Sequence, residues 1–206
     1  MNPVRITIIA ATLIFICGCS LYRAPTPIGD YYYLNPDADM AMVGKVVLVQ
    51  LRNNSAYPQI STDVTRALYE EIQKKQLFSL RVIPEDDPEW RSLNIDIDSF
   101  SQPKQLYLAA KTLRCDAIMV GDITEYTPYP HLVLGLRLKM IKCIDGQLLW
   151  GFEQVWDASD KKTEYRIKKY LAKQTRTGSE VLGEQLVTVS SIKFVKFVAY
   201  EVALSF

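Results

Sequence analysis

The sequence is poor in the residues that most often carry chemistry. Its 206 residues include one histidine, His131, and only nine glycines. His131 lies beside Pro128-Tyr129-Pro130, and no serine, cysteine or carboxylate accompanies it in a recognisable catalytic pattern, so we interpret it as a turn residue and not a general base. No phosphate-binding loop of the type Gly-x-x-x-x-Gly-Lys-Ser/Thr occurs. We therefore expect no enzymatic activity, no catalytic residue and no cofactor.

Metal-binding patterns are also scarce. The acidic stretch within Glu85–Phe100 carries Asp86, Asp87, Asp96 and Asp98, which supply the oxygen ligands that calcium prefers. These residues lack the spacing and the glycine of an EF-hand loop. We favour a solvated, irregular loop here and expect no metal site.

Neither sign of charge dominates. The chain has 24 basic and 23 acidic residues, and one of the basic residues, Arg5, lies in the predicted signal peptide described below. Without Arg5 the mature protein would carry 23 charges of each sign and be formally neutral. A nucleic-acid-binding protein is expected to be strongly basic, so nucleic acid is not an expected partner.

Long hydrophobic runs are missing as well. The apolar run from Ile6 to Ile16 has about the length of a signal-peptide core and falls short of the ~20 residues that a membrane-spanning helix needs. No other apolar stretch is long and uncharged enough to span a bilayer. The chain is therefore predicted to be anchored to a membrane without crossing it.

The apolar run ends in Ile16-Cys17-Gly18-Cys19, which resembles a bacterial lipobox. The resemblance implies cleavage between Gly18 and Cys19, so that residues 1–18 are a signal peptide, and it implies diacylglyceryl and acyl chains such as palmitate on Cys19. Two or three chains anchor a protein stably because each buried methylene contributes ~0.8 kcal/mol. An ordinary secretory signal with an incidental cysteine is the alternative.

Residues 19–43 are predicted to form a lipidated tether. Pro25 and Pro27 favour an extended chain, and Tyr31–Leu34 is a short β-prone run that can add an edge strand. By resemblance to the sorting rule of enteric bacteria, Ser20 after the lipidated cysteine implies the outer membrane, with the protein facing the periplasm.

Residues 44–206 are predicted to form a single α/β domain. The first half reads as strands at Lys45–Leu51, Ser79–Pro84 and Asp116–Thr124, with helices at Pro58–Gln76 and Ser101–Arg114. The second half reads as strands at Leu132–Cys143 and Gln147–Asp157, a basic helix at Ser159–Thr177 and a last helix at Ser191–Phe206. This order predicts a mixed sheet of about five strands packed against helices, with the basic helix as an addition.

The register of the last two strands presents a conflict. Asp145-Gly146 is a strong two-residue hairpin signal, and the register that it sets places Lys139 opposite Phe152 and puts Glu153 among leucines. Either a bulge shifts the register or a helix covers the aromatic face, which we favour, or the sheet has an exposed face of aromatic and cationic side chains. On the last interpretation the candidate partner-binding residues, together with a loop tyrosine, are Arg137, Trp150, Phe152 and Tyr129.

Cys115 and Cys143 lie opposite each other if the chain turns near Tyr129. An exported protein meets an oxidising compartment, so the two can form a disulfide. Both also fit as small buried hydrophobic residues. The sequence leaves both alternatives open.

Four segments together resemble a known lipoprotein domain. They are Val46-Val47-Leu48-Val49, Ser61-Thr62-Asp63-Val64-Thr65, the phrase from Cys115 to Thr124, and Asp145-Gly146-Gln147-Leu148-Leu149-Trp150. The domain is the periplasmic-facing one shared by CsgG, LpoB and the amino-terminal part of TolB. The resemblance implies secretion-channel subunits, activators and envelope adaptors, with no catalytic residues to carry over.

We therefore expect a non-enzymatic, lipid-anchored envelope protein that acts as an adaptor or activator through contacts with another envelope protein. The alternative is a self-assembling structural or secretion-associated subunit related to CsgG, which would form homo-oligomers. The long inserted hairpins from which CsgG builds its pore have no counterpart between the first helix and the second strand, so we do not expect a channel.

Overall fold

The computed structural model describes residues 32–95, 103–175 and 190–206. The signal peptide with Gly18 and Cys19 lies outside these residues, as do Asp96 and Asp98. The strands are β1 (Tyr32–Leu34), β2 (Lys45–Val49), β3 (Arg52–Asn53), β4 (Ser79–Ile83), β5 (Ala117–Thr127), β6 (Val133–Lys142) and β7 (Leu148–Asp157). The helices are the single 3-10 turn η1 (Met40–Met42) and α2 (Gln59–Gln73), α3 (Pro88–Ser92), α4 (Pro103–Leu113), α5 (Lys161–Thr175) and α7 (Ser191–Ala203).

One mixed sheet organises the fold. Its strand order is β1-β7-β6-β5-β2-β4, and β3 pairs with β5 beside this path. The strands β4, β2 and β5 run parallel to one another, whereas β5, β6, β7 and β1 pair antiparallel. The predicted mixed α/β class is therefore confirmed, and β1 is the edge strand expected at Tyr31–Leu34, whereas β3 was not predicted.

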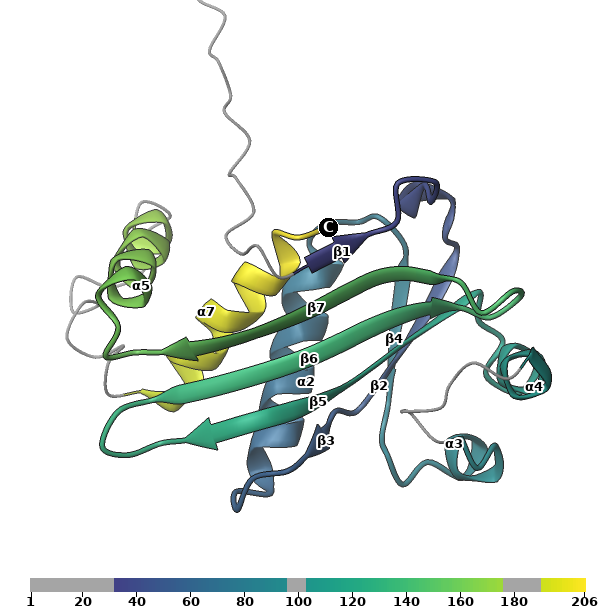
Figure 1. Ribbon diagram of the computed structural model, residues 1–206, viewed down its shortest axis with the longest axis horizontal. Coiled ribbons are helices and arrows are strands. Elements are labelled where there is room, and N and C mark those ends of the chain that lie inside the picture. Colours follow the sequence, from purple (N-terminus) through teal and green to yellow (C-terminus); the bar gives the residue numbers. More distant parts are fainter. Residues whose placement is uncertain (1–31, 96–102, 176–189) are drawn as a thin grey trace, which may run out of the picture.

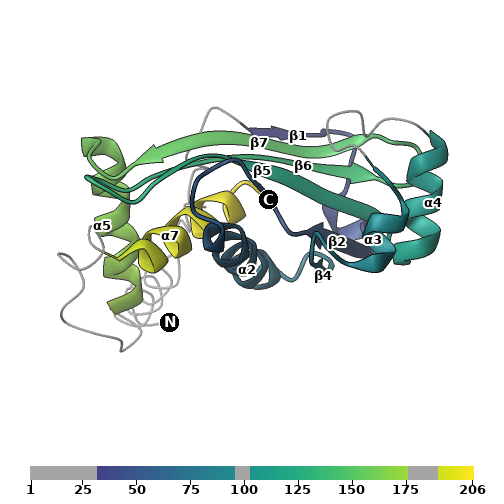
Figure 2. The same ribbon diagram turned by 90° about the horizontal axis from the view of Figure 1, so that it is seen from below.

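Helices cover both faces of this sheet. The helices α2 and α7 lie side by side against one face, as Figures 1 and 2 show. The other face packs against α3 and α4 through a smaller core that contains Val47, Ile118 and Leu106. The helices α4 and α5 lie at opposite ends of the long strands (Figures 1 and 2), so the two ends of the molecule present different surfaces.

Local sequence explains how α2 is held. Apolar residues at Ile60, Val64 and Leu68 recur at helical spacing and are buried. The hydroxyl of Ser61 donates to the carbonyl oxygen of Leu51 at 2.6 Å, and the Leu51 amide donates to Thr65 Oγ1 at 3.1 Å. These two bonds fix the start of α2 to the end of β2.

The stretch expected to be an irregular loop contains a short helix, α3. The Asp87 side chain accepts hydrogen bonds from the amides of Glu89 and Trp90, and Pro88 occupies the first turn. An aspartate before a proline is a helix start signal. Trp90 buries its ring in the smaller core, and this burial stabilises a helix too short to form alone.

The conflict in the last hairpin is resolved by a bulge. Leu138 pairs with Phe152 and Met140 with Trp150, but Ile141 pairs with Leu148, so Leu149 is the extra residue. The register set by the turn alone is therefore wrong, and the bulge interpretation is confirmed. Because of the shift, the aromatic residues of β7 share a face with the leucines of β6.

The basic helix α5 packs at one end of this aromatic face. Ile167 and Tyr170 are buried against α7, and Tyr170 contacts the ring of Phe197 edge-on. Arg166 lies 3.5 Å from the buried carboxylate of Glu201, which also accepts a hydrogen bond from Trp156 Nε1 at 2.7 Å. Burial raises the pKa of Glu201 above its ordinary value, and these two partners counteract that effect.

Candidate functional site

The four residues predicted to contact a partner do not form one surface. Trp150 and Phe152 lie in the core beneath α7, with exposed fractions of 0% and 5%. This corrects the interpretation that placed them on an open aromatic face, and the bulge is the physical reason. Arg137 projects from the opposite face of the sheet, and Tyr129 is 83% exposed in the loop between β5 and β6.

Arg137 belongs to an ion-pair cluster around the buried carboxylate of Asp122. The Asp122 carboxylate, 3% exposed, lies 2.6 Å from Arg52 Nε and 3.1 Å from Arg137 Nη2. Burial by itself would raise the pKa of Asp122, but the hydrogen bonds and charges of the two arginines outweigh it and lower the pKa. The cluster ties β3, β5 and β6 together, which is a structural role.

The lone histidine is not arranged for catalysis. His131 Nε2 lies 3.6 Å from the Asp157 carboxylate, which also accepts a hydrogen bond from the Ser159 hydroxyl at 2.7 Å. In a catalytic triad the imidazole stands between the hydroxyl and the carboxylate. Here the carboxylate stands between them, so His131 is not placed to take a proton from Ser159.

Cys115 and Cys143 come together as predicted from the turn. Their sulfur atoms are 3.9 Å apart, both residues are buried, and both thiols are free in this structure. A hydrogen bond to Cys115, together with burial, raises the pKa of the Cys143 thiol. The disulfide stays a prediction.

A cavity opens beside these cysteines at the α4 end of the sheet. Its volume is about 700 Å³, and it lies between η1, α4 and the β6–β7 turn. We call it the end cavity; its walls include Asp37, Asp39, Met42, Tyr107, Cys115, Asp116, Cys143 and Ile144. Three large side chains at the rim of the cavity are exposed to solvent: Met42 and Ile144 are 82% and 83% exposed, and Tyr107 is 65% exposed.

The rim of the end cavity is acidic. Asp39 caps η1 by accepting the Ala41 amide at 2.9 Å, and Asp116 accepts the Lys45 amide at 2.7 Å. Within the part of the chain that the structure describes, neither of these carboxylates forms an ion pair. The positive charge of Lys142, which lines the cavity, is paired with Asp145: Lys142 Nζ lies 3.2 Å from Asp145 Oδ2. The cavity thus combines exposed apolar groups with negative charge.

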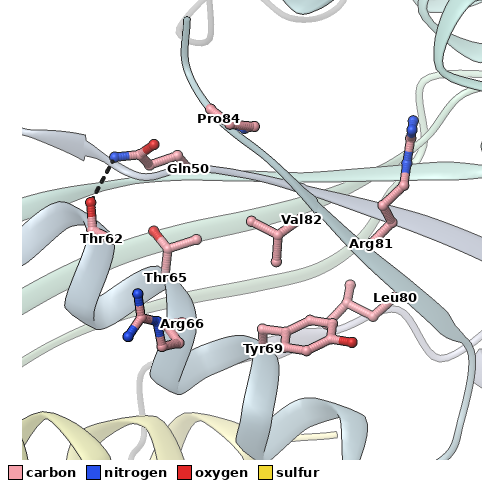
Figure 3. Close-up of a pocket in the computed structure, with 9 residues that line it drawn as sticks. All are labelled: Gln50, Thr62, Thr65, Arg66, Tyr69, Leu80, Arg81, Val82 and Pro84. Carbon is pink, nitrogen blue, oxygen red and sulfur yellow. Dashed lines mark hydrogen bonds between the residues drawn. The ribbon is translucent and has the colours of Figure 1, made fainter. Parts of the chain in front are cut away.

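A second cavity of about 440 Å³ lies between α2 and β4 (Figure 3). We call it the edge groove; it is lined by Gln50, Thr62, Thr65, Arg66, Tyr69, Leu80, Arg81, Val82 and Pro84. Gln50 Nε2 donates to Thr62 Oγ1 at 3.3 Å, as the dashed line in Figure 3 marks. Figure 3 also shows Val82 directed into the groove and Arg81 directed away from it.

Sequence reasoning missed both cavities because each is built from segments that are distant in the chain. The sequence signal for the end cavity was weak: Met42 lies in the short apolar run Met40–Val43, Ile144 precedes the turn residues Asp145-Gly146, and neither belongs to an amphipathic pattern. For the edge groove the signal was the order of the strands, which the sequence does not give.

Comparison with known proteins finds only distant similarity to solved structures. No known protein family and no curated protein sequence matches the chain. Similar solved structures include the PelC dodecamer from Paraburkholderia phytofirmans (12% identity, 77% of this chain and 93% of that chain, TM-score 0.45). Lipoprotein GNA1162 from Neisseria meningitidis is similar at 14% identity, over 66% of this chain and 99% of that one, with a TM-score of 0.43.

LpoB, one of the three proteins of the predicted resemblance, is also among the similar structures. The C-terminal domain of Escherichia coli LpoB matches at 15% identity over 58% of this chain and 87% of that chain, with a TM-score of 0.39. The likeness to CsgG and TolB stays a resemblance in sequence. Because all three TM-scores are below 0.5, no function or assembly is transferred from these structures.

A helix must be both long and apolar to cross a bilayer. In residues 32–95, 103–175 and 190–206, no helix is both long and apolar enough to cross a membrane.

Proposed function

We propose that the protein is a lipid-anchored lipoprotein of a bacterial cell envelope that acts without chemistry, as an adaptor or activator that holds another envelope protein. The observation that carries this proposal is the end cavity, where Met42, Tyr107 and Ile144 expose apolar surface around a hollow of about 700 Å³. Apolar groups gathered at one concave site are typical of binding surfaces.

The acidic and apolar side chains at the rim of the end cavity determine which kind of partner segment can bind there. Asp37, Asp39 and Asp116 surround the exposed apolar side chains, so a segment that inserts an aliphatic or aromatic side chain flanked by lysine or arginine would fit the cavity. Complementary charge at the rim mainly raises the rate of encounter and excludes wrong partners, while the buried apolar contact supplies the affinity.

The lipobox supports the location. Cys19 is the proposed lipidation site after cleavage at Gly18, and Ser20 favours the outer membrane with the protein facing the periplasm. Globomycin should block processing of the precursor, and labelled palmitate should appear on the wild-type protein but not on a Cys19→Ser variant. Unlabelled wild-type protein would contradict the anchor.

Partner capture tests the end cavity. In quantitative pull-downs from detergent-solubilised envelopes, we expect the amount of one captured envelope protein to fall at least about tenfold in the double variant Met42→Asp/Ile144→Asp. The reason is that a charge replaces the buried apolar contact. Both side chains are exposed, so the fold should be unaffected. Val155→Asp is the matched control, since Val155 is 53% exposed on the uncovered face of β7. If every captured protein persists in the double variant, the end cavity is not the docking site.

Self-assembly is the second candidate function, and the charge of α5 favours it. Lys161, Lys162 and Lys169 are exposed on α5, at the end of the molecule opposite the acidic end cavity (Figure 1). Opposite charges at the two ends suit a head-to-tail contact between copies, which closes into a ring or continues as a filament.

Light scattering separates the two functions. A stable assembly of the Cys19→Ser chain that dissociates in Lys161→Glu/Lys162→Glu and re-forms when Asp37→Lys/Asp39→Lys is added would establish self-assembly. A monomer at all protein concentrations would exclude it and leave the adaptor function.

A further inference from the structure

The strand β4 forms an open edge of the sheet. It is the last strand in the order β1-β7-β6-β5-β2-β4 and pairs only with β2 among the strands that the structure describes. An unpaired edge presents main-chain donors and acceptors to which another chain can add as a strand.

The hydrogen bonds of β4 show which groups are presented. The Ser79 amide donates to Gly44 O at 2.9 Å, and the carbonyl oxygen of Ile83 accepts the Gln50 amide at 2.9 Å. Residues of a strand alternate in the side to which their main-chain groups point. Since Ser79 and Ile83 point toward β2, the N–H and C=O groups of Leu80 and Val82 point to the open edge.

The edge groove lies directly beside these groups. Leu80 and Val82 are two residues apart, so their side chains share one face, and both line the groove together with Thr65, Arg66 and Tyr69 of α2 (Figure 3). Val82 is 36% exposed, whereas Leu80 is 7% exposed and forms part of the floor. A strand added to β4 would place every second side chain over this groove.

Charge defines the added strand further. Arg66 is exposed on α2 at the groove, and within the described residues it has no ion-pair partner. Arg81 points to the other face, where its Nη2 donates to the carbonyl oxygen of Leu113 at 3.0 Å. A cation therefore stands on each side of the edge, which favours an incoming segment with carboxylates.

We propose that the β4 edge and the edge groove form a docking site for an extended segment of a partner protein. The segment adds to β4 as a further strand through the main-chain groups of Leu80 and Val82, places an aliphatic side chain in the groove, and sets an aspartate or glutamate against Arg66. This site shares no residue with the end cavity, so either one can fail its test while the other stands.

A defined peptide tests the site. The probe is the peptide Asp-Val-Thr-Val-Thr-Val-Asp, titrated into the full-length, ¹⁵N-labelled protein in detergent micelles. We expect the amide signals of Leu80 and Val82 to move and to become protected from solvent exchange. The same peptide N-methylated on every amide should not bind, because neither of its edges can then donate the strand hydrogen bonds.

Two variants localise the contact. Val82→Pro removes the outward N–H while keeping the bonds to β2, since proline is tolerated where the amide faces away from the sheet, and it should abolish binding; Val82→Thr is the control that keeps the amide and should bind. Arg66→Glu should weaken binding of the acidic peptide by about tenfold and improve binding of the same peptide with lysines in place of aspartates.

Three results would overturn the proposal. These are no shift at β4 at millimolar peptide, equal binding by the N-methylated peptide, and shifts centred on Met42 and Ile144 in place of β4. A stability measurement on Val82→Pro separates lost binding from lost folding, and the N-methylated peptide makes the same test on the unaltered protein.

Discussion

At the scale of single residues, Gly121 shows how closely β5 and β6 approach. A Cβ atom at Gly121 would collide with the main-chain carbonyl oxygen of Arg137 and lie 2.6 Å from a methyl carbon of Leu138. Main chain cannot yield as a flexible side chain does. We predict that Gly121→Ala lowers the free energy of unfolding by about 3 kcal/mol, measured by urea denaturation.

Gly151 in β7, on the other side of β6 from β5, provides the control. A Cβ atom there would have its nearest contact at 3.7 Å, from a methyl group of Leu148, which is an ordinary packing distance. Gly151→Ala should therefore change stability by less than about 1 kcal/mol. Equal losses in the two variants would mean that the β5–β6 spacing is not the cause.

Asp122 makes the stability depend on pH. Its pKa is lowered in the folded state because Arg52 and Arg137 more than offset its burial, so its contribution is present above the unfolded pKa and is lost as pH falls through the folded pKa. We predict that Asp122→Asn costs about 2–3 kcal/mol at neutral pH and flattens the stability profile at acidic pH.

Unfolding measured at several pH values checks this prediction. The wild type and the Asn variant should converge as the pH drops below the folded pKa of Asp122. A constant difference between them from neutral to strongly acidic pH would show that the charge of Asp122 is not what stabilises the β3–β5–β6 junction.

At the scale of elements, the sequence predicted each segment that has a clear period. The strand β6 and the helices α2 and α7 repeat apolar residues at intervals of two or of three to four, whereas β2 and β5 are continuous apolar runs, and all of them appear within a few residues of the expected bounds. The helix α3 was missed because its signal, Asp87-Pro88, is two residues long and its stability comes from the distant core around Trp90. A bulge was the favoured interpretation, but its position at Leu149 was not predicted, since nothing local fixes it.

The helix α5 buries few apolar side chains for its length. Most of its side chains are polar, and its main buried apolar side chains are those of Ile167 and Tyr170. The Arg166–Glu201 ion pair lies beside them. We predict that Ile167→Ala speeds amide hydrogen exchange throughout α5 while exchange in β5 and β6 stays unchanged, because local opening of a weakly packed element needs less free energy than global unfolding.

Lys169→Ala is the control for this measurement, since Lys169 is exposed on the same helix. It removes a side chain of similar length without removing a buried contact. Faster exchange in β5 and β6 of the Ile167 variant would contradict a local role and make α5 part of the main cooperative unit.

At the scale of the whole molecule, the two cores share their strands. In β2, Val47 faces the α3–α4 core and Leu48 faces the α2–α7 core; Ile118 and Met119 alternate likewise in β5. Neither core can lose its strands while the other keeps them. We therefore expect a single unfolding transition.

The tryptophans report on this cooperativity. Trp90 lies in the smaller core, whereas Trp150 and Trp156 lie beneath α7. In Trp90→Phe the fluorescence comes only from the α7 side, and its denaturant midpoint should coincide with that of far-UV circular dichroism. Two separate midpoints would show that the faces unfold independently.

The candidate sites required the whole molecule and could not be predicted from the sequence. The end cavity joins residues near positions 40, 107 and 144, and the edge groove depends on β4 being outermost. Periodicity reports which side of an element is buried, but not which elements become neighbours. Arg137 and Tyr129 were predicted as surface residues; Arg137 is half-buried and Tyr129 is exposed, and the structure places them apart.

The predicted tether joins the sheet at the edge opposite to the one where a new strand could add. The chain that leads back to Cys19 enters the sheet at β1, one margin of the strand order, and β4 is the opposite margin. Five strand spacings separate these margins, a width of about 24 Å. The tether and the open margin therefore lie on opposite sides of the sheet, and a segment that extends the sheet beyond β4 would leave β1 and its attachment undisturbed.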